Sequence, residues 1–347
     1  MKQHVKKRFL WADLVRIIAI YFVLVIHSSS LPSHIPKNTL DIRFLSEALI
    51  KTCVPLFVML SGALLLGKKE TYSVFFKKRF SRIIIPWIFW AAISTMLALY
   101  LLHTAIPSQA LKDFSGSLES FWFIPMIIGL YLLTPATRIF IRNAKKQDIL
   151  LVLMLWFVGI SFLPYTRDSL AFPQHVDNGL VRQIVSYWGY FVLGYYILLH
   201  KTQKIWLLFG CFLTVGGIIW TMLGEYFLSL QHNGLTLSGF YEYGSPSIVF
   251  TSVGCFLIIL TLAKYVEPKL HDNVKNFIVL VSSFSLGIFF IHQIVQQILA
   301  HFLGTSYLIV FFVYIDNFIN AGILFVVCFV LIAIIDKVPF GKKLLGR

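Results

Sequence analysis

Three ionisable side chains lie within one apolar stretch near the N-terminus: Asp13, Arg16 and His27. On a helix, Asp13 and Arg16 are three residues apart and share a face. Arg16 and His27 are eleven residues apart, which is close to three turns, or about 16 Å along the axis. Ionisable groups at membrane depth are costly and commonly functional, so this polar stripe indicates a site inside a helix bundle. The alternative is a headgroup-level Asp13–Arg16 pair, with His27 at the far end of the helix.

A second histidine, His292, follows the mostly apolar residues 282–291. Its segment is expected to cross the membrane in the same direction as the segment that carries His27. Both histidines then lie at a similar depth, which favours a site over an isolated structural histidine. No third ligand is expected at that depth, and the four cysteines lack zinc spacing, so we do not expect a metal site.

Residues 77–82 read Lys-Lys-Arg-Phe-Ser-Arg, directly before the third apolar segment. Arg79 and Arg82 are therefore three residues apart at the edge of the membrane. Guanidinium groups bind phosphates through paired hydrogen bonds, which makes Arg79 and Arg82, with Lys78 as a weaker candidate, ligands for a phosphorylated substrate. The alternative is that these residues only anchor the segment at the membrane surface.

The elements that carry these residues must lie in a membrane. The 347 residues are 58% hydrophobic and only 13% charged, whereas about a quarter of a soluble domain is charged. A membrane-spanning helix needs about 20 mostly apolar residues. Ten such segments are present, at residues 10–30, 42–66, 82–102, 121–141, 147–164, 181–199, 204–223, 246–265, 276–301 and 308–335. We therefore expect an all-α polytopic membrane protein with about ten transmembrane helices, forming one domain over residues 1–347.

The basic residues are divided unequally between the two sides of this arrangement. Of the 30 Lys and Arg, 23 lie on the side of the termini, 6 lie on the opposite side, and Arg16 lies within the first segment. The positive-inside rule then places both termini in the cytoplasm, as an even number of segments requires. Because topology explains the net charge of +15, we expect no nucleic-acid partner.

Six motifs, in order along essentially the whole chain, resemble the acyltransferase 3 family of integral membrane acyltransferases. The stretch from Asp13-Leu-Val-Arg16 to His27 is similar to the family's Arg-x10-His element, with its Asp three residues earlier. Arg79-x-x-Arg82, followed by Ile-Ile-Ile-Pro, is similar to the family's Arg-x-x-Arg element. The four shorter matches lie at residues 54–62, 121–135, 190–196 and 285–292.

The resemblance implies transfer of an acyl group, usually acetyl, from cytoplasmic acyl-coenzyme A to a hydroxyl of a cell-surface or lipid-linked glycan. The cell membrane would be a bacterial plasma membrane, and acetyl-coenzyme A would be a co-substrate rather than a permanently bound cofactor. Some members carry an extra esterase-like domain outside the membrane. This chain lacks such an extension, so we expect the stand-alone type.

Acyl transfer to a hydroxyl requires a base and donors for the developing oxyanion. His27 is expected to be the base, since histidine has an ordinary pKa of about 6.5, or alternatively a transient acyl carrier. Asp13 would orient Arg16, and Arg16 would line the donor channel. The substrate-binding candidates are Arg79, Arg82 and Lys78 for the coenzyme A phosphates, and His292 and Trp122 for the acceptor. Trp122 is alternatively an interfacial aromatic residue.

Two other functions use some of the same features. A transporter or flippase of a lipid-linked saccharide would also need buried ionisable residues and basic cytoplasmic loops. It has no need, however, for a phosphate-binding Arg79-x-x-Arg82 element beside a histidine base. A structural membrane subunit does not explain why Asp13, Arg16 and His27 share a face.

Overall fold

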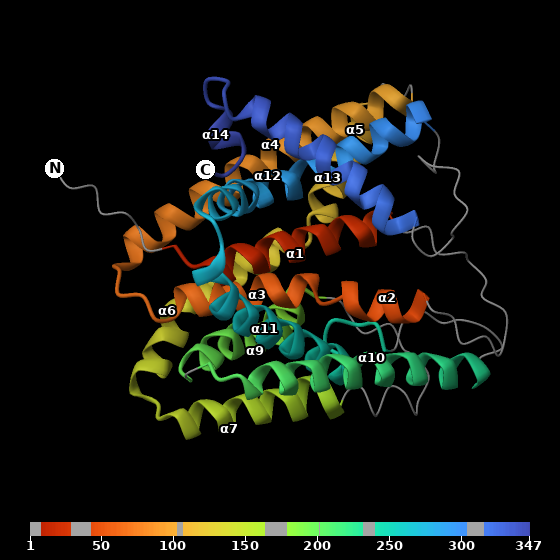
Figure 1. The fold of residues 1–347 in the computed structure, drawn as a ribbon. Coiled ribbons are helices and arrows are strands. Elements are labelled where there is room, and N and C mark those ends of the chain that lie inside the picture. Colours follow the sequence, from red (N-terminus) through yellow and green to blue (C-terminus); the bar gives the residue numbers. More distant parts are fainter. Residues whose placement is uncertain are drawn as a thin grey trace.

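The computed structural model describes residues 8–28, 43–102, 107–163, 179–200, 202–231, 240–303 and 316–347, and these form a bundle of helices without strands (Figure 1). The α-helices in chain order are α1 (Leu10–Ser28), α2 (Arg43–Ile50), α3 (Cys53–Leu65), α4 (Tyr72–Leu102), α5 (Pro107–Ser120), α6 (Phe123–Asn143), α7 (Lys146–Trp156), α9 (Leu180–Leu198), α10 (Ile205–Gln231), α11 (Pro246–Val266), α12 (Asp272–Leu303), α13 (Asp316–Ile335) and α14 (Gly341–Leu344). A π-helix, η1 (Phe157–Phe162), continues α7, and a 3-10 turn, η2 (Glu267–Lys269), follows α11.

Eight helical stretches of the described chain are long and apolar enough to cross a membrane. The expected all-α polytopic membrane protein is thereby confirmed. The two further expected segments, 147–164 and 181–199, are helical as α7 with η1 and as α9, but α9 carries Arg182 and Gln183 in its first turn. That these two also cross the membrane stays a prediction. The ends of the expected segments at 29–30, 42, 164 and 308–315 lie outside the described residues.

Helix α1 occupies the middle of the bundle, between α12 and α13 on one side and α3 and α11 on the other (Figure 1). Its side chains Val15, Ala19, Ile20 and Leu24 are fully buried. Apolar residues therefore fix α1 against its neighbours along most of its length. Of the polar stripe of α1, this central position buries Asp13 completely and Arg16 in part, whereas His27 is exposed.

Helices α3 and α9 pack with their backbones in direct contact. A Cβ atom added at Gly62 would meet the backbone carbonyl oxygen of Phe191, and one added at Gly194 would meet that of Met59. Small residues permit this close approach, which is common between helices in membranes. The contact holds α3 in place, and α3 carries part of the wall of the site described below.

Helix α4 begins at Tyr72, ten residues before the expected segment 82–102. Its 31 residues correspond to about 46 Å, which exceeds the roughly 30 Å thickness of the hydrocarbon region. The first turns therefore extend beyond the hydrocarbon, where Lys and Arg are favoured and Phe75, fully buried, anchors them to the bundle. Arg79 and Arg82, which the sequence placed directly before or at the start of the third segment, consequently lie within the helix.

Candidate active site

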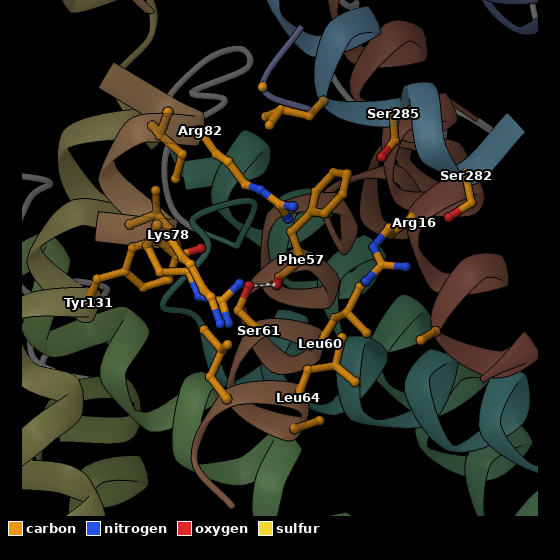
Figure 2. A pocket seen from close by; sticks show the side chains of 18 of the residues that line it. Arg16, Phe57, Leu60, Ser61, Leu64, Lys78, Arg82, Tyr131, Ser282 and Ser285 are labelled. Atoms are coloured by element: carbon orange, nitrogen blue, oxygen red, sulfur yellow. Dashed lines mark hydrogen bonds between the residues drawn. The ribbon is translucent and has the colours of Figure 1, made fainter. Parts of the chain in front are cut away.

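A cavity of about 1440 Å³ lies at the end of the bundle where α1 begins. Its walls come from α1, α3, α4, α6 and α12 and from residues 342–347. Figure 2 shows Arg16 reaching it from α1 and Arg82 from α4, with Ser61 of α3 between them. The structure thus brings together residues from motifs far apart in the sequence.

The cavity lining is strongly basic. Its described residues include one acid, Glu70, and eight bases: Arg8, Arg16, Lys68, Lys78, Arg79, Arg82, Lys342 and Arg347. All four predicted donor-side cations, Arg16, Lys78, Arg79 and Arg82, are among them. The inner part of the lining is apolar, with Leu60, Leu64 and Ile127 among its residues. A ligand that combines several negative charges with a long, thin and less polar arm is complementary to such a cavity.

Asp13 is buried beneath the cavity and holds Arg16. The Arg16 guanidinium donates a hydrogen bond of 2.9 Å to the carboxylate, Arg8 donates one of 3.2 Å, and the Ser282 hydroxyl donates one of 2.6 Å. The contact predicted between Asp13 and Arg16 from their spacing is therefore confirmed. Because Asp13 is not itself a lining residue, it acts on a ligand only through its partners Arg16, Arg8 and Ser282, which do line the cavity.

The Arg79 guanidinium has a donor group that is available to a ligand. Its Nε atom is buried and has no hydrogen-bond partner among the described residues, while its Nη2 atom lies 3.9 Å from the Glu70 carboxylate. Unsatisfied buried donors are uncommon, and a bound ion or water is one explanation for them. Arg79 is therefore placed to bind an anion that enters the cavity.

Glu70 is held by Arg138, a residue that the sequence indicated only as a topology signal. Arg138 is 2% exposed and donates hydrogen bonds to Glu70 at 3.0 Å and to the Leu65 carbonyl oxygen at 2.7 Å. Burial alone would raise the pKa of Glu70, but the hydrogen bond from Arg138 and the charges of Arg79 and Arg138 together hold that pKa below its ordinary value. Glu70 thus stays ionised and balances part of the positive charge.

The two histidines lie side by side, His27 in the last turn of α1 and His292 within the second half of α12. The ring centroids of His27 and His292 are 4.9 Å apart, and the side-chain amide of Gln296 donates a hydrogen bond to the His27 carbonyl oxygen. His27 is exposed, whereas His292 is 1% exposed. The similar depth predicted for the two histidines agrees with this arrangement.

The tautomer of His292 follows from its hydrogen bond. Its Nδ1 atom lies 2.6 Å from the carbonyl oxygen of Phe289, and a carbonyl can only accept, so Nδ1 carries the proton in the neutral ring. Nε2 is then an acceptor, and it is buried without a hydrogen-bond partner among the described residues. His292 therefore presents a free lone pair in the region next to His27.

Three aromatic residues of the cavity lining form an aromatic wall, and one of them contacts His292. Neither histidine lines the cavity, whereas Phe57, Phe123 and Phe289 do. The rings of Phe57 and Phe123 are 6.1 Å apart, and those of Phe123 and Phe289 are 5.6 Å apart. The Phe289 ring lies 5.9 Å from the His292 ring. Phe289 thus lines the cavity and also contacts His292, which links the cavity to the histidine pair.

Trp122 directly precedes α6 and does not line the cavity. Its ring lies 6.1 Å from the Tyr187 ring and 5.7 Å from the Tyr243 ring. No contact between Trp122 and either histidine is present among the described interactions. Of the predicted site residues, Trp122 is therefore the one that the structure does not bring to the others, although its neighbour Phe123 belongs to the aromatic wall. No group of three or more His, Cys, Asp or Glu in the described ranges could hold a metal ion.

The fold and the cavity define an all-α polytopic membrane protein with a basic internal cavity next to a histidine pair. Residues 9–337 match the family model Acyl_transf_3, an acyltransferase domain, so the chain belongs to the acyltransferase 3 family and the resemblance noted in its motifs is confirmed. This membership identifies it as a membrane acyltransferase. No match was found among curated proteins or among solved structures.

Proposed function

We propose that the protein transfers an acyl group, most simply acetyl, from cytoplasmic acyl-coenzyme A to a hydroxyl of a cell-surface or lipid-linked glycan. The observation that carries the proposal is that Arg16, Lys78, Arg79 and Arg82 meet in one cavity whose inner wall is next to His27 and His292. With both termini in the cytoplasm of a bacterial cell, this cavity would face the pool of acyl-coenzyme A. The lipid bilayer and the glycan acceptor are the other partners, and no nucleic acid is involved.

The donor would bind with its phosphates at the mouth and its thioester inward. Coenzyme A carries a diphosphate and a ribose phosphate, which match the basic residues of the lining. Arg79 and Arg82 can bind phosphate oxygens through paired hydrogen bonds, and such charge-assisted bonds are about twice as strong as neutral ones. The thin pantetheine arm would lie along the apolar inner part of the cavity. The acyl group would then reach the wall formed by Phe57, Phe123 and Phe289.

His27 would take the proton of the acceptor hydroxyl as its oxygen attacks the thioester carbonyl carbon. The carbon–sulfur bond then breaks, and the thiolate receives the proton from His27, so that an ester and coenzyme A leave. The exposed position of His27 lets an acceptor approach from the side opposite the cavity. Arg16, which is fixed by Asp13, directs its remaining N–H groups toward the donor.

His292 would orient His27 for this step. Its Nε2 lone pair can accept the N–H of the neighbouring ring, and a rotation of His27 at this centroid separation brings a nitrogen within hydrogen-bonding range. The second nitrogen of His27 would then face the acceptor hydroxyl with its lone pair. This arrangement follows the general rule that a catalytic base is itself oriented by a third group. An acceptor contact of Trp122 is proposed from its motif alone, because, among the described residues, the structure does not bring Trp122 to the histidines.

The acceptor can be identified by comparing cells with and without the gene. Loss of an ester from one cell-surface or lipid-linked glycan, and its return with the wild-type gene, is the expected result. The transporter alternative predicts instead that the whole saccharide fails to reach the surface. Unchanged acylation of every surface glycan would contradict the proposal.

A further inference from the structure

Residues 341–347, which include α14, form one side of the cavity mouth. We infer that this segment is part of the donor-binding wall and that Lys342 binds the ribose 3′-phosphate of acyl-coenzyme A. The inference rests on the proposed donor cavity and adds a binding element to it. The segment lies outside residues 9–337, the part of the chain that matches the family model, and none of the motifs noted in the sequence includes it.

The segment is packed tightly against the helices that bear the site. The Trp90 indole N–H of α4 donates a hydrogen bond of 2.8 Å to the Leu344 carbonyl oxygen. Leu345 is 1% exposed, and a Cβ added at Gly287 of α12 would lie 3.1 Å from the Leu345 side chain. The segment is therefore fixed between α4 and α12.

Gly346 brings this segment directly to the phosphate-binding turn of α4. Its φ of +70° lies in the left-handed region that favours glycine, and an added Cβ would meet the carbonyl oxygen of Arg82. A larger residue at position 346 could not keep this contact. The backbone of the segment thus lies against the turn that carries Arg79 and Arg82.

The two adjacent lysines of α14 point to different surroundings. Lys342 lines the cavity, together with Gly346 and Arg347. Lys343 is not among the lining residues, and its ammonium lies 5.4 Å from the Phe340 ring centroid. Arg347 is held by a hydrogen bond of 2.7 Å to Asp336 and lies over the Phe284 ring. Of the two cations of the segment that line the cavity, Lys342 is therefore the one without a carboxylate partner among the described residues.

The position of Lys342 selects the phosphate that it would bind. The thioester must lie inward to react beside His27, so the adenosine end of the donor stays at the mouth. The 3′-phosphate belongs to that end, whereas the diphosphate lies between it and the pantetheine arm. Lys342 is exposed at the mouth and would meet the 3′-phosphate.

The contact between Lys342 and the 3′-phosphate can be tested by comparing two donors, acetyl-coenzyme A and acetyl-dephospho-coenzyme A. The second donor lacks the 3′-phosphate. We expect Lys342→Ala to raise the KM for acetyl-coenzyme A about tenfold, in line with one lost charge-assisted hydrogen bond, with kcat unchanged. The KM for the dephospho donor should be the same in this variant and in the wild type. Lys343→Ala is the matched control and should leave both KM values unchanged.

Two other outcomes overturn the inference in distinguishable ways. If Lys342→Ala leaves both KM values unchanged while the double variant Arg79→Ala, Arg82→Ala raises them, the segment does not bind the donor but the cavity does. If the double variant also changes neither KM, the donor cavity itself is refuted. An equal rise for both donors in Lys342→Ala would also contradict the assignment to the 3′-phosphate.

Discussion

His292 presents an unprotonated ring nitrogen beside His27, because the Phe289 carbonyl oxygen accepts the hydrogen bond from its Nδ1 atom. The relationship joins the last turn of α1 to the second half of α12, which are distant in sequence. The two histidines therefore differ. His292 is buried and its tautomer is fixed by a hydrogen bond, whereas His27 is exposed and no described hydrogen bond fixes the tautomer of its ring.

Two substitutions at His292 distinguish a positioning role from a structural one. A glutamine carries a polar end group at the distance of Nε2, whereas an asparagine reproduces the Nδ1 donor to Phe289 and lacks the Nε2 acceptor. We expect His292→Gln to keep more activity than His292→Asn, with kcat reduced about tenfold or more in the latter. Steady-state kinetics at several pH values, with thermal unfolding as a control for folding, measures this. An Asn variant as active as the wild type would show that only the bond to Phe289 matters.

Removing both arginines of the α4 motif should weaken donor binding. In Arg79→Ala, Arg82→Ala, the loss of charge-assisted hydrogen bonds of about 1.5–3 kcal/mol each predicts at least a tenfold weaker affinity for acetyl-coenzyme A. Lysine at both positions should restore it only in part, because the paired hydrogen bonds are lost. Titration calorimetry of the purified protein measures the affinity. Unchanged binding in the double alanine variant would leave these residues as membrane anchors only.

The lowered pKa of Glu70 predicts that the stability of the folded protein depends on pH. Its pKa is held below the ordinary value of 4.5 in the folded protein. The stabilisation that ionised Glu70 contributes to the folded protein is therefore fully present at pH values above its ordinary pKa. It is lost as the pH falls through the lowered pKa. Glu70→Gln should unfold at a lower temperature than the wild type at pH 7, and the difference should shrink on acidification. Thermal unfolding in detergent from pH 7 down to pH 3 tests this, with exposed Glu119→Gln as the control. A constant difference over that range would contradict the assignment.

Topology can be tested without any assay of activity. The 23 basic residues on the side of the termini predict that a reporter fused after Arg347 reads as cytoplasmic. A second reporter inserted between α7 and α9, within residues 164–178, should read as extracytoplasmic if α7 with η1 crosses the membrane. A cytoplasmic result for the insertion would show that this helix does not cross. An extracytoplasmic result for the fusion would contradict the proposed orientation.

The helices could be predicted well, because a helix that crosses a membrane needs a long run of apolar residues and such runs can be read directly from the sequence. It placed the start of α4 too late, since the basic residues 77–82 resemble a loop while Phe75 and its neighbours pack them as a helix. It predicted one membrane segment at residues 42–66, and Leu45–Leu65 is indeed one candidate span. A turn at Lys51 and Thr52 divides this span into α2 and α3, and Pro55 lies in the first turn of α3, where a missing N–H is tolerated.

Spacing along one helix predicted part of the site, and the expected depth of His27 and His292 agrees with their contact. Asp13 and Arg16 are neighbours by spacing, and Arg79 and Arg82 likewise. The pairing of Glu70 with Arg138, the aromatic wall and the segment at Lys342 depend on contacts between distant parts of the chain, which spacing does not reveal. The acceptor nitrogen of His292 is likewise set by a single backbone carbonyl.

The central claim is that His27 is the base for acyl transfer from a donor bound in the basic cavity. The most direct measurement is acetyl transfer per mole of purified His27→Ala protein, with labelled acetyl-coenzyme A and the acceptor glycan. Loss of a general base typically costs about 10²–10⁴-fold in rate, so this variant should bind the donor normally and transfer almost nothing. His200→Ala, whose ring bonds to the Tyr196 carbonyl oxygen, should retain wild-type activity. Transfer by His27→Ala within about threefold of wild type, far above the range for a lost base, would contradict the account.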